Sequence, residues 1–204
     1  MPNPDQQLML LVKAIVAGDS EKCAMLLAES PRLATTIFEQ GATRSSAKPY
    51  FIPELGRYIY AGDTALHIAA AAYEPTIVTQ LISAGAKVLA TNRFGYNPLH
   101  SAAAGSPNSP RWNPSRQAMT IVALVKAGID PNMTDKRGVT PLHIAVRTRC
   151  ALAVKTLVEC GADPTKRNKN GSDALVLATN NTGRGGSGSP DSKREQQLIL
   201  EILR

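Results

Sequence analysis

The stretch "GVTPLHIAV" (residues 138–146) decides how this chain folds, because close copies of it recur. The copies are "GDTALHIAA" from Gly62, "GYNPLHSAA" from Gly95 and "GSDALVLAT" from Gly171, at spacings of 33, 43 and 33 residues. Such a period is typical of repeat arrays, in which each unit buries its apolar face against its neighbours. We therefore expect a stacked solenoid.

Each copy has the residues of a turn followed by a helix. The opening glycine suits a turn that needs a positive φ. Thr140 is a good N-cap, Pro141 suits the first helical position, and Leu142 and Ala145 share one helix face. A second helix then ends near Gly161, where a C-cap favours glycine. The N-cap position of the other copies holds Thr64, Asn97 and Asp173.

These features resemble the ankyrin repeat, a turn and two antiparallel helices in about 33 residues with a T-P-L-H-x-A signature. "TPLHIA" (140–145) matches the signature fully, whereas "DALVLA" (173–178) has lost the histidine. The resemblance covers roughly residues 60–204 and implies an all-α solenoid of about five helix-turn-helix units. It also implies that His67, His100 and His143 are structural. Packed helices would hold these side chains about 10 Å apart, too far for a shared metal.

The expected organisation is one domain, residues 1–204. "YAGDTALHIAAAAY" (60–73), together with the loops described below, is similar to bacterial ankyrin-repeat proteins and is compatible with a bacterial source. The expected segments are a degenerate N-terminal capping repeat (5–34), an aromatic-rich insertion (35–60), and repeats at 61–90, 91–133, 134–166 and 167–204.

The insertion at residues 35–60 holds five of the nine aromatic residues of the chain. Its end, "RYIY" (57–60), alternates like a strand and leads into the turn before Gly62. Its aromatic side chains either pack the insertion onto the solenoid or form a contact surface beside the next turn. The candidate residues of that surface are Tyr58, Tyr60, Phe94 and Tyr96.

Two further insertions, at residues 105–116 and 180–192, fall between the helices of alternate repeats, on either side of the turn "RTRC" (147–150). Arginine matches carboxylate and phosphate, and glycine-rich backbone can bind an anion through its N–H groups. We therefore expect a site for an acidic or phosphate-bearing ligand on this edge. The alternative is that the loops cover one another. The candidate residues are Arg111, Trp112, Arg147, Arg149 and Arg184.

The formal net charge is +7, and several of the cations lie in the turns "DKRG" (135–138) and "TKRNKNG" (165–171). These are either ordinary solvated charges or a short cationic ridge. A ridge would permit nucleic-acid binding through phosphate contacts, which is the alternative function. The cations concerned are Lys136, Arg137, Lys166, Arg167 and Lys169.

The favoured function is a non-catalytic protein-interaction module that binds an acidic protein or peptide through its turns, concave face and long loops. No catalytic or metal-ligand grouping stands outside the repeat motif, so we expect neither an enzyme nor a cofactor. Cys150, beside Arg149, is the only cysteine with a reason for a lowered pKa. An odd number of cysteines and the absence of a long apolar run indicate a cytoplasmic protein that binds no membrane. We expect a monomer.

Overall fold

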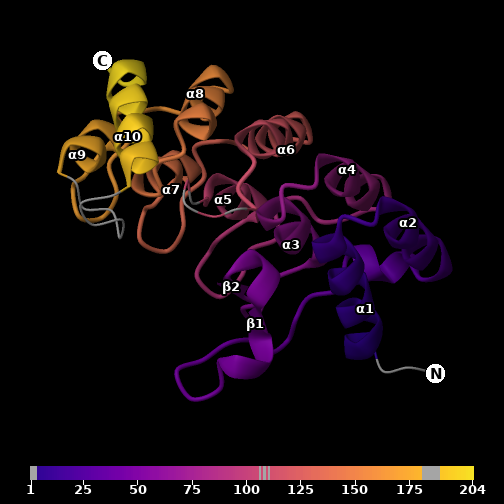
Figure 1. Cartoon of the computed structure of the whole chain (residues 1–204). Helices are drawn as coiled ribbons and strands as arrows, with labels where there is room; N and C mark the ends of the chain where they lie inside the picture. The colour runs from indigo at the N-terminus through magenta and orange to yellow at the C-terminus, as the bar shows by residue number, and fades with distance from the viewer. Residues whose placement is uncertain (1–3, 106, 108, 110, 181–188) are drawn as a thin grey trace.

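The computed structural model describes residues 4–105, 107, 109, 111–180 and 189–204, with side chains from residue 7 onwards. Over these residues it contains ten α-helices and one two-stranded hairpin (Figure 1). The predicted all-α solenoid of helix pairs is confirmed. The helices are α1 (Pro4–Ala17), α2 (Ser20–Glu29), α3 (Ala65–Ala71), α4 (Pro75–Ser83), α5 (Pro98–Ala103), α6 (Pro114–Lys126), α7 (Pro141–Arg147), α8 (Ala151–Glu159), α9 (Ala174–Thr179) and α10 (Pro190–Ile202).

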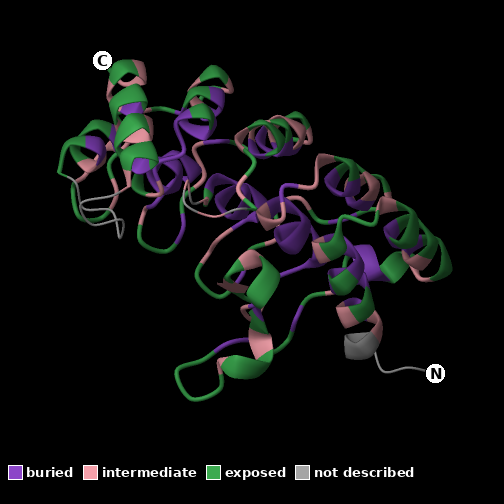
Figure 2. Cartoon of the chain, viewed as in Figure 1, coloured by how far each residue is buried: buried purple, intermediate pink, exposed green. Residues whose placement is uncertain are grey.

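The helices stack in two layers. Helices α1, α3, α5, α7 and α9 pack in that order as one layer, and α2, α4, α6, α8 and α10 form the other. Figure 1 shows the pairs following one another from α1 and α2 at one end to α9 and α10 at the other. Buried residues lie mainly where helices meet, and exposed residues lie on the outer faces and loops (Figure 2). Each pair is thus supported chiefly by its neighbours.

The repeated motif forms a reciprocal cap at the start of the first-layer helix. The Thr140 Oγ1 accepts from the His143 N–H at 3.3 Å, and the His143 Nδ1 accepts from the Thr140 N–H at 3.1 Å. Two N–H groups that the helix leaves unpaired are thereby satisfied. Gly138 supplies the positive φ, 73°, of the preceding turn. The same cap forms at the starts of α3 and α5.

The three histidines also tie each repeat to the next. The Nε2 atoms of His67, His100 and His143 lie 2.9, 3.0 and 3.0 Å from the carbonyl oxygens of Tyr96, Val139 and Ser172. A carbonyl only accepts, so each Nε2 carries the proton. All three side chains are at most 1% exposed, which agrees with their structural interpretation.

The insertion before α3 is partly a hairpin, with β1 (Phe51–Ile52) paired antiparallel to β2 (Arg57–Tyr58). Of the short 3₁₀ turns, η1 (Pro31–Ala34) follows α2, η2 (Lys48–Tyr50) precedes β1, and η3 (Pro53–Leu55) connects the two strands. The strand expected over 57–60 therefore ends at Tyr58. Ile52 and Ile59 are buried in the core, so the hairpin is anchored by aliphatic side chains.

The first and last pairs depart most from the repeat. Gly18 and Asp19 form the turn between α1 and α2, and Asp19 caps α2. In α9, Val176 stands at the histidine position and is 36% exposed. Helices α9 and α10 contact each other, while residues 181–188, where the sequence predicts a loop, lie outside the described residues. In the part of the chain described, no helix is long and apolar enough to cross a membrane.

Candidate functional site

The turns that precede the first-layer helices form a continuous edge. The N–H groups of Arg93, Lys136 and Lys169 donate to the carbonyls of Ala61, Phe94 and Arg137 in the preceding turn, at 2.8, 3.1 and 3.0 Å. Backbone bonds therefore hold the four turns in a row. We call these turns, residues 60–63, 92–96, 135–139 and 168–172, the fingers.

A buried or half-buried polar side chain fixes the shape of each later finger. The Asn92 Oδ1 accepts from the N–H groups of Phe94 and Tyr96, and the Asp135 Oδ1 accepts from those of Arg137 and Val139. Asn168 makes the same pair of bonds in the last finger. This position was not predicted from the sequence, although its spacing of 43 and 33 residues matches that of the repeats.

Aromatic and cationic side chains gather on the first three fingers. The Tyr60 and Phe94 rings meet edge to face at 4.8 Å, and Phe94 lies 6.2 Å from Tyr96. The Arg93 guanidinium carbon lies 5.2 Å from the Tyr60 ring centre and 4.7 Å from that of Phe94. Arg137 lies over Tyr96 at 5.8 Å. We call Tyr60, Arg93, Phe94, Tyr96 and Arg137 the finger surface.

The charge on the finger surface is permanent and positive. Partial burial disfavours the charged form of Arg137, but the Asp135 carboxylate and the Tyr96 hydroxyl outweigh this and raise the arginine pKa above its usual value. The Arg137 Nε lies 2.9 Å from the Asp135 Oδ2, and its side chain is 59% exposed. Arginine in this setting still offers donors to a ligand.

The predicted aromatic surface is therefore only partly assembled. The structure brings Tyr60, Phe94 and Tyr96 together, and adds Arg93, which the sequence analysis did not single out. Tyr58 lies instead on the hairpin, where its ring pairs with Phe51 at 4.9 Å. Phe38 of the insertion is buried against the array, while Tyr58 is 37% exposed, so a contact surface on the insertion stays a prediction.

The hairpin spans from the fingers to the helix–helix edge. The Arg57 Nη2 lies 3.3 Å from the buried Asp63 Oδ2, and its Nη1 donates to the His67 carbonyl in α3 at 3.4 Å. At the hairpin turn, the Arg111 Nη1 donates to the Glu54 carbonyl at 2.9 Å. The hairpin therefore belongs to the packed structure of the array.

The residues expected on the helix–helix edge converge only in part. Arg111 reaches the hairpin, and the half-buried Trp112 points its Nε1–H at the Gln117 Oε1, 2.8 Å away. Arg149, with φ 58°, is only 6% exposed, whereas Arg147 is exposed. Arg184 lies outside the described residues. Arg147 and Arg149 line a common gap of about 10 Å³, which neither Arg111 nor Trp112 lines, so the joint arginine site on this edge stays a prediction.

Comparison with known families agrees with the repeat geometry. A family model described as "Ankyrin repeats (3 copies)" matches residues 115–186, and one described as "Ankyrin repeat" matches residues 61–93. The chain belongs to the ankyrin-repeat family. The expected family is thereby confirmed.

Two relatives share part of this ankyrin array. NF-kappa-B inhibitor delta of Mus musculus is 41% identical over 88 residues, which is 42% of this chain and 24% of that protein. NF-kappa-B inhibitor alpha of Rattus norvegicus is 36% identical over 93 residues, 44% of this chain and 26% of that protein. The match thus spans about a quarter of each relative. Both relatives are mammalian and give no support to a bacterial source, which stays an expectation.

Cys150 differs from its expected chemistry. The thiol is fully buried at the start of α8, and burial raises its pKa to about 11. Thr148, Gln117 and Trp112 favour the thiolate but do not offset the burial. The expectation of a lowered pKa is therefore wrong, because the nearby Arg149 does not outweigh the loss of water. In the described residues, no group of three or more His, Cys, Asp or Glu could hold a metal ion.

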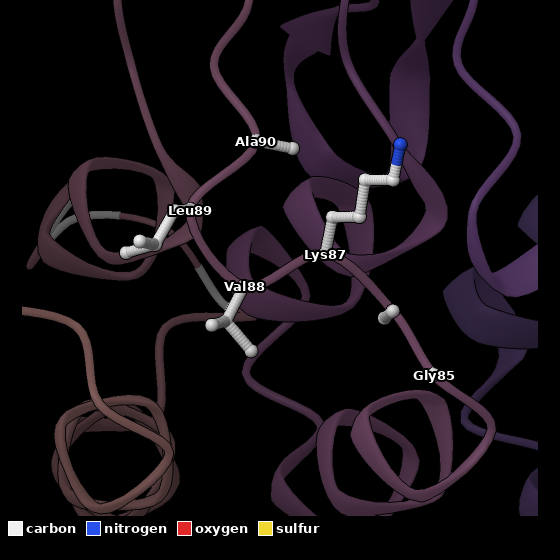
Figure 3. A pocket seen from close by; sticks show the side chains of 6 residues that line it. Gly85, Lys87, Val88, Leu89 and Ala90 are labelled. Carbon is white, nitrogen blue, oxygen red and sulfur yellow. The ribbon is translucent and has the colours of Figure 1, made fainter.

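A shallow hollow of about 590 Å³ lies where α4 leads into the next finger. It is lined by residues 85–90, and Figure 3 shows the Lys87 side chain pointing away from Val88 and Leu89. Leu89 stands at the position of Asn132, which bonds to Gly161 and Asp163 in the next repeat. The hollow therefore marks a missing polar link between repeats and gathers no group for chemistry.

Proposed function

We propose that this ankyrin array is a protein-interaction module whose partner docks on the finger surface. The observation that carries the proposal is the exposed Phe94, held between Tyr60 and Tyr96 with Arg93 over its ring. Aromatic and arginine side chains are the commonest anchors of protein interfaces, because they combine large area with fixed geometry. The names of the two relatives, inhibitors of NF-kappa-B, support binding of another protein as the class of function.

The finger surface is favoured over the helix–helix edge because its side chains are already assembled. Three rings and two guanidinium groups contact one another there. The exposed arginines among the described candidates on the other edge are Arg111 and Arg147, and Arg111 already donates to the Glu54 carbonyl. An acidic partner suits the finger surface. An acidic or phosphate-bearing ligand at the other edge stays a second candidate, and Arg147→Ala would weaken its binding without loss of stability.

The experiment is affinity capture from a lysate of the organism that encodes the chain, with and without nuclease. The test variant is Tyr60→Ser/Phe94→Ser, which removes two rings of the finger surface. The matched control is Leu152→Ser on α8, because Leu152 and Phe94 are each 37% exposed. We expect a captured protein that persists after nuclease treatment, is retained by the control and is lost by the test variant.

Two outcomes would contradict the proposal. A partner retained by Tyr60→Ser/Phe94→Ser would place binding elsewhere on the array. Capture that disappears on nuclease treatment would favour the nucleic-acid alternative, in which the finger cations contact phosphates. Thermal melts of all variants would show whether any loss of capture comes from unfolding.

A further inference from the structure

One side-chain position of the fingers recurs along the whole edge. Tyr60, Arg93, Lys136 and Lys169 each stand two residues before the glycine of their finger, at spacings of 33, 43 and 33. The backbone bonds that join successive fingers begin at the last three of these residues. The row therefore presents one aromatic side chain followed by three cations, in a fixed order along the array.

The three cations of this row are available to a ligand. Arg93, Lys136 and Lys169 are exposed, and none of them forms an ion pair with an acidic side chain in the described residues. Lys166, by contrast, donates from Nζ to the Asn132 carbonyl at 2.8 Å and lies partly buried. Of the cations in the predicted ridge, Lys136 and Lys169 therefore belong to this row, and Lys166 is used within the fold.

The spacing of the row follows from the backbone. Each finger has two backbone arms that hydrogen-bond to each other, for example through the Asn92 N–H and the Tyr96 carbonyl. The first arm of each later finger also hydrogen-bonds to the finger before it, as the Arg93 N–H does to the Ala61 carbonyl. Hydrogen-bonded backbone arms lie about 4.8 Å apart, so equivalent residues of successive fingers are about 10 Å apart. An extended peptide rises about 3.3 Å per residue, so every third residue advances about 10 Å.

We infer that the partner segment is an extended acidic peptide with an apolar residue followed by carboxylates at the third, sixth and ninth positions after it. The apolar residue would contact Tyr60 and Phe94, and the carboxylates would face Arg93, Lys136 and Lys169 in turn. This inference rests on the proposed function and specifies its partner. A peptide is favoured over a nucleic acid because the Arg93 guanidinium lies over the Tyr60 and Phe94 rings, which leaves less ring face for base stacking.

The test uses the full chain and short fluorescein-labelled peptides in anisotropy titrations at low ionic strength. One peptide carries leucine and then glutamate at the third, sixth and ninth following positions, with serine elsewhere. Its isomers have the same composition, with the glutamates contiguous or at alternate positions. Exposed ion pairs contribute a factor of about 1.5–5 each, so we expect the peptide in register to bind about tenfold more tightly than either isomer.

The variants separate a register effect from general attraction. Arg93→Gln/Lys136→Gln/Lys169→Gln removes the row, and we expect it to bind all three peptides equally weakly. The control, Lys13→Gln/Lys22→Gln/Lys155→Gln, removes the same charge from exposed positions on α1, α2 and α8 and should keep the tenfold preference. Equal binding of the three peptides by the unmodified chain would contradict the predicted spacing. It would mean that the finger surface attracts acidic peptides whatever the spacing of their charges.

Two further results would separate this inference from the proposed function. If no acidic peptide binds while Tyr60→Ser/Phe94→Ser still abolishes capture of a protein, the acidic peptide is wrong and the finger surface stands. If an oligothymidylate competitor binds more tightly than every peptide and depends on the same three cations, the row serves nucleic acid. If neither the binding of the peptides nor the capture of a protein changes when the finger residues are substituted, both proposals fail.

Discussion

The Nε2–H of His100 donates to the carbonyl oxygen of Val139, 39 residues further along the chain, at 3.0 Å. Burial of the ring lowers the His100 pKa from 6.5 to about 4, although the Val139 carbonyl and Asp135 act in the opposite direction. Burial also lowers the pKa of His67 and His143. The stack is thus held by three neutral imidazoles.

The first prediction is that the array loses stability in mild acid. Since the folded pKa of His100 lies below 6.5, the unfolded chain takes up the proton first, and stability is complete above pH 6.5 and falls as the pH approaches 4. The shift of His100 from 6.5 to about 4 corresponds to roughly 3 kcal/mol. Urea unfolding at a series of pH values would measure the loss.

His100→Gln is the control for this prediction, because glutamine does not titrate. The variant should be less stable at neutral pH, and its free energy of unfolding should change less between pH 6.5 and 4. An unchanged slope would show that groups other than His100 cause the loss of stability in acid.

The second prediction compares one motif position in two repeats. Leu142 is 1% exposed between α7 and its neighbours, whereas Leu175, at the same position of α9, is 40% exposed. Leu142→Asp would bury an unpaired charge and should cost more than about 4 kcal/mol, while Leu175→Asp should cost within about 1 kcal/mol. Thermal and urea unfolding would measure both. Similar losses would mean that the two ends of the array are equally packed.

The third prediction concerns the turn between α7 and α8. Arg149 is 6% exposed and lines a small gap of about 10 Å³ together with Arg147, Val146 and Leu177. Because Arg149 is buried, Arg149→Ala should destabilise the array by about 1–3 kcal/mol. The exposed neighbour, Arg147→Ala, should change stability by less than about 0.5 kcal/mol. The expected role of Arg149 in ligand contact would regain support if the two variants melted alike.

The fourth prediction orders the reactivity of the cysteines. Cys23 and Cys150 are fully buried, and burial raises the pKa of each thiol to about 11, whereas Cys160 is half-buried. A thiolate reacts and a buried thiol does not, so a disulfide reagent at pH 8 should label Cys160 first. Cys23 and Cys150 should react only in denaturant. Fast labelling of Cys150 in the folded chain would show that its surroundings open.

The repeats were predictable because the information is local. Thr140, Pro141 and His143 lie within four residues, and the cap that they form depends on little else. The meeting of Tyr60, Phe94 and Tyr96 was predictable for a related reason, since the period places all three on adjacent turns. A periodic sequence thus fixes which side chains share an edge.

The helix–helix edge was not predictable because its geometry depends on distant contacts. Arg111 bonds to Glu54, which is 57 residues earlier in an insertion with no repeat period. Arg149 has a positive φ although the position is not a glycine, so the sequence did not indicate this backbone conformation. The resulting burial of Arg149 gives it a role in packing. The pKa of Cys150 follows from the same burial, which the adjacent arginine in the sequence does not reveal.

The histidine bonds give the stack a direction. Each repeat offers an N–H to the repeat that follows and a carbonyl to the one before, from His67 through His143. Removing the first repeats would leave carbonyl oxygens, such as that of Tyr96, without their histidine donors. Ending the chain before Ser172 would instead leave the Nε2–H of His143 without its acceptor. Orphaned N–H groups are tolerated less well than orphaned carbonyls. Shortening this array one repeat at a time should therefore destabilise it more from its carboxyl end than from its amino end.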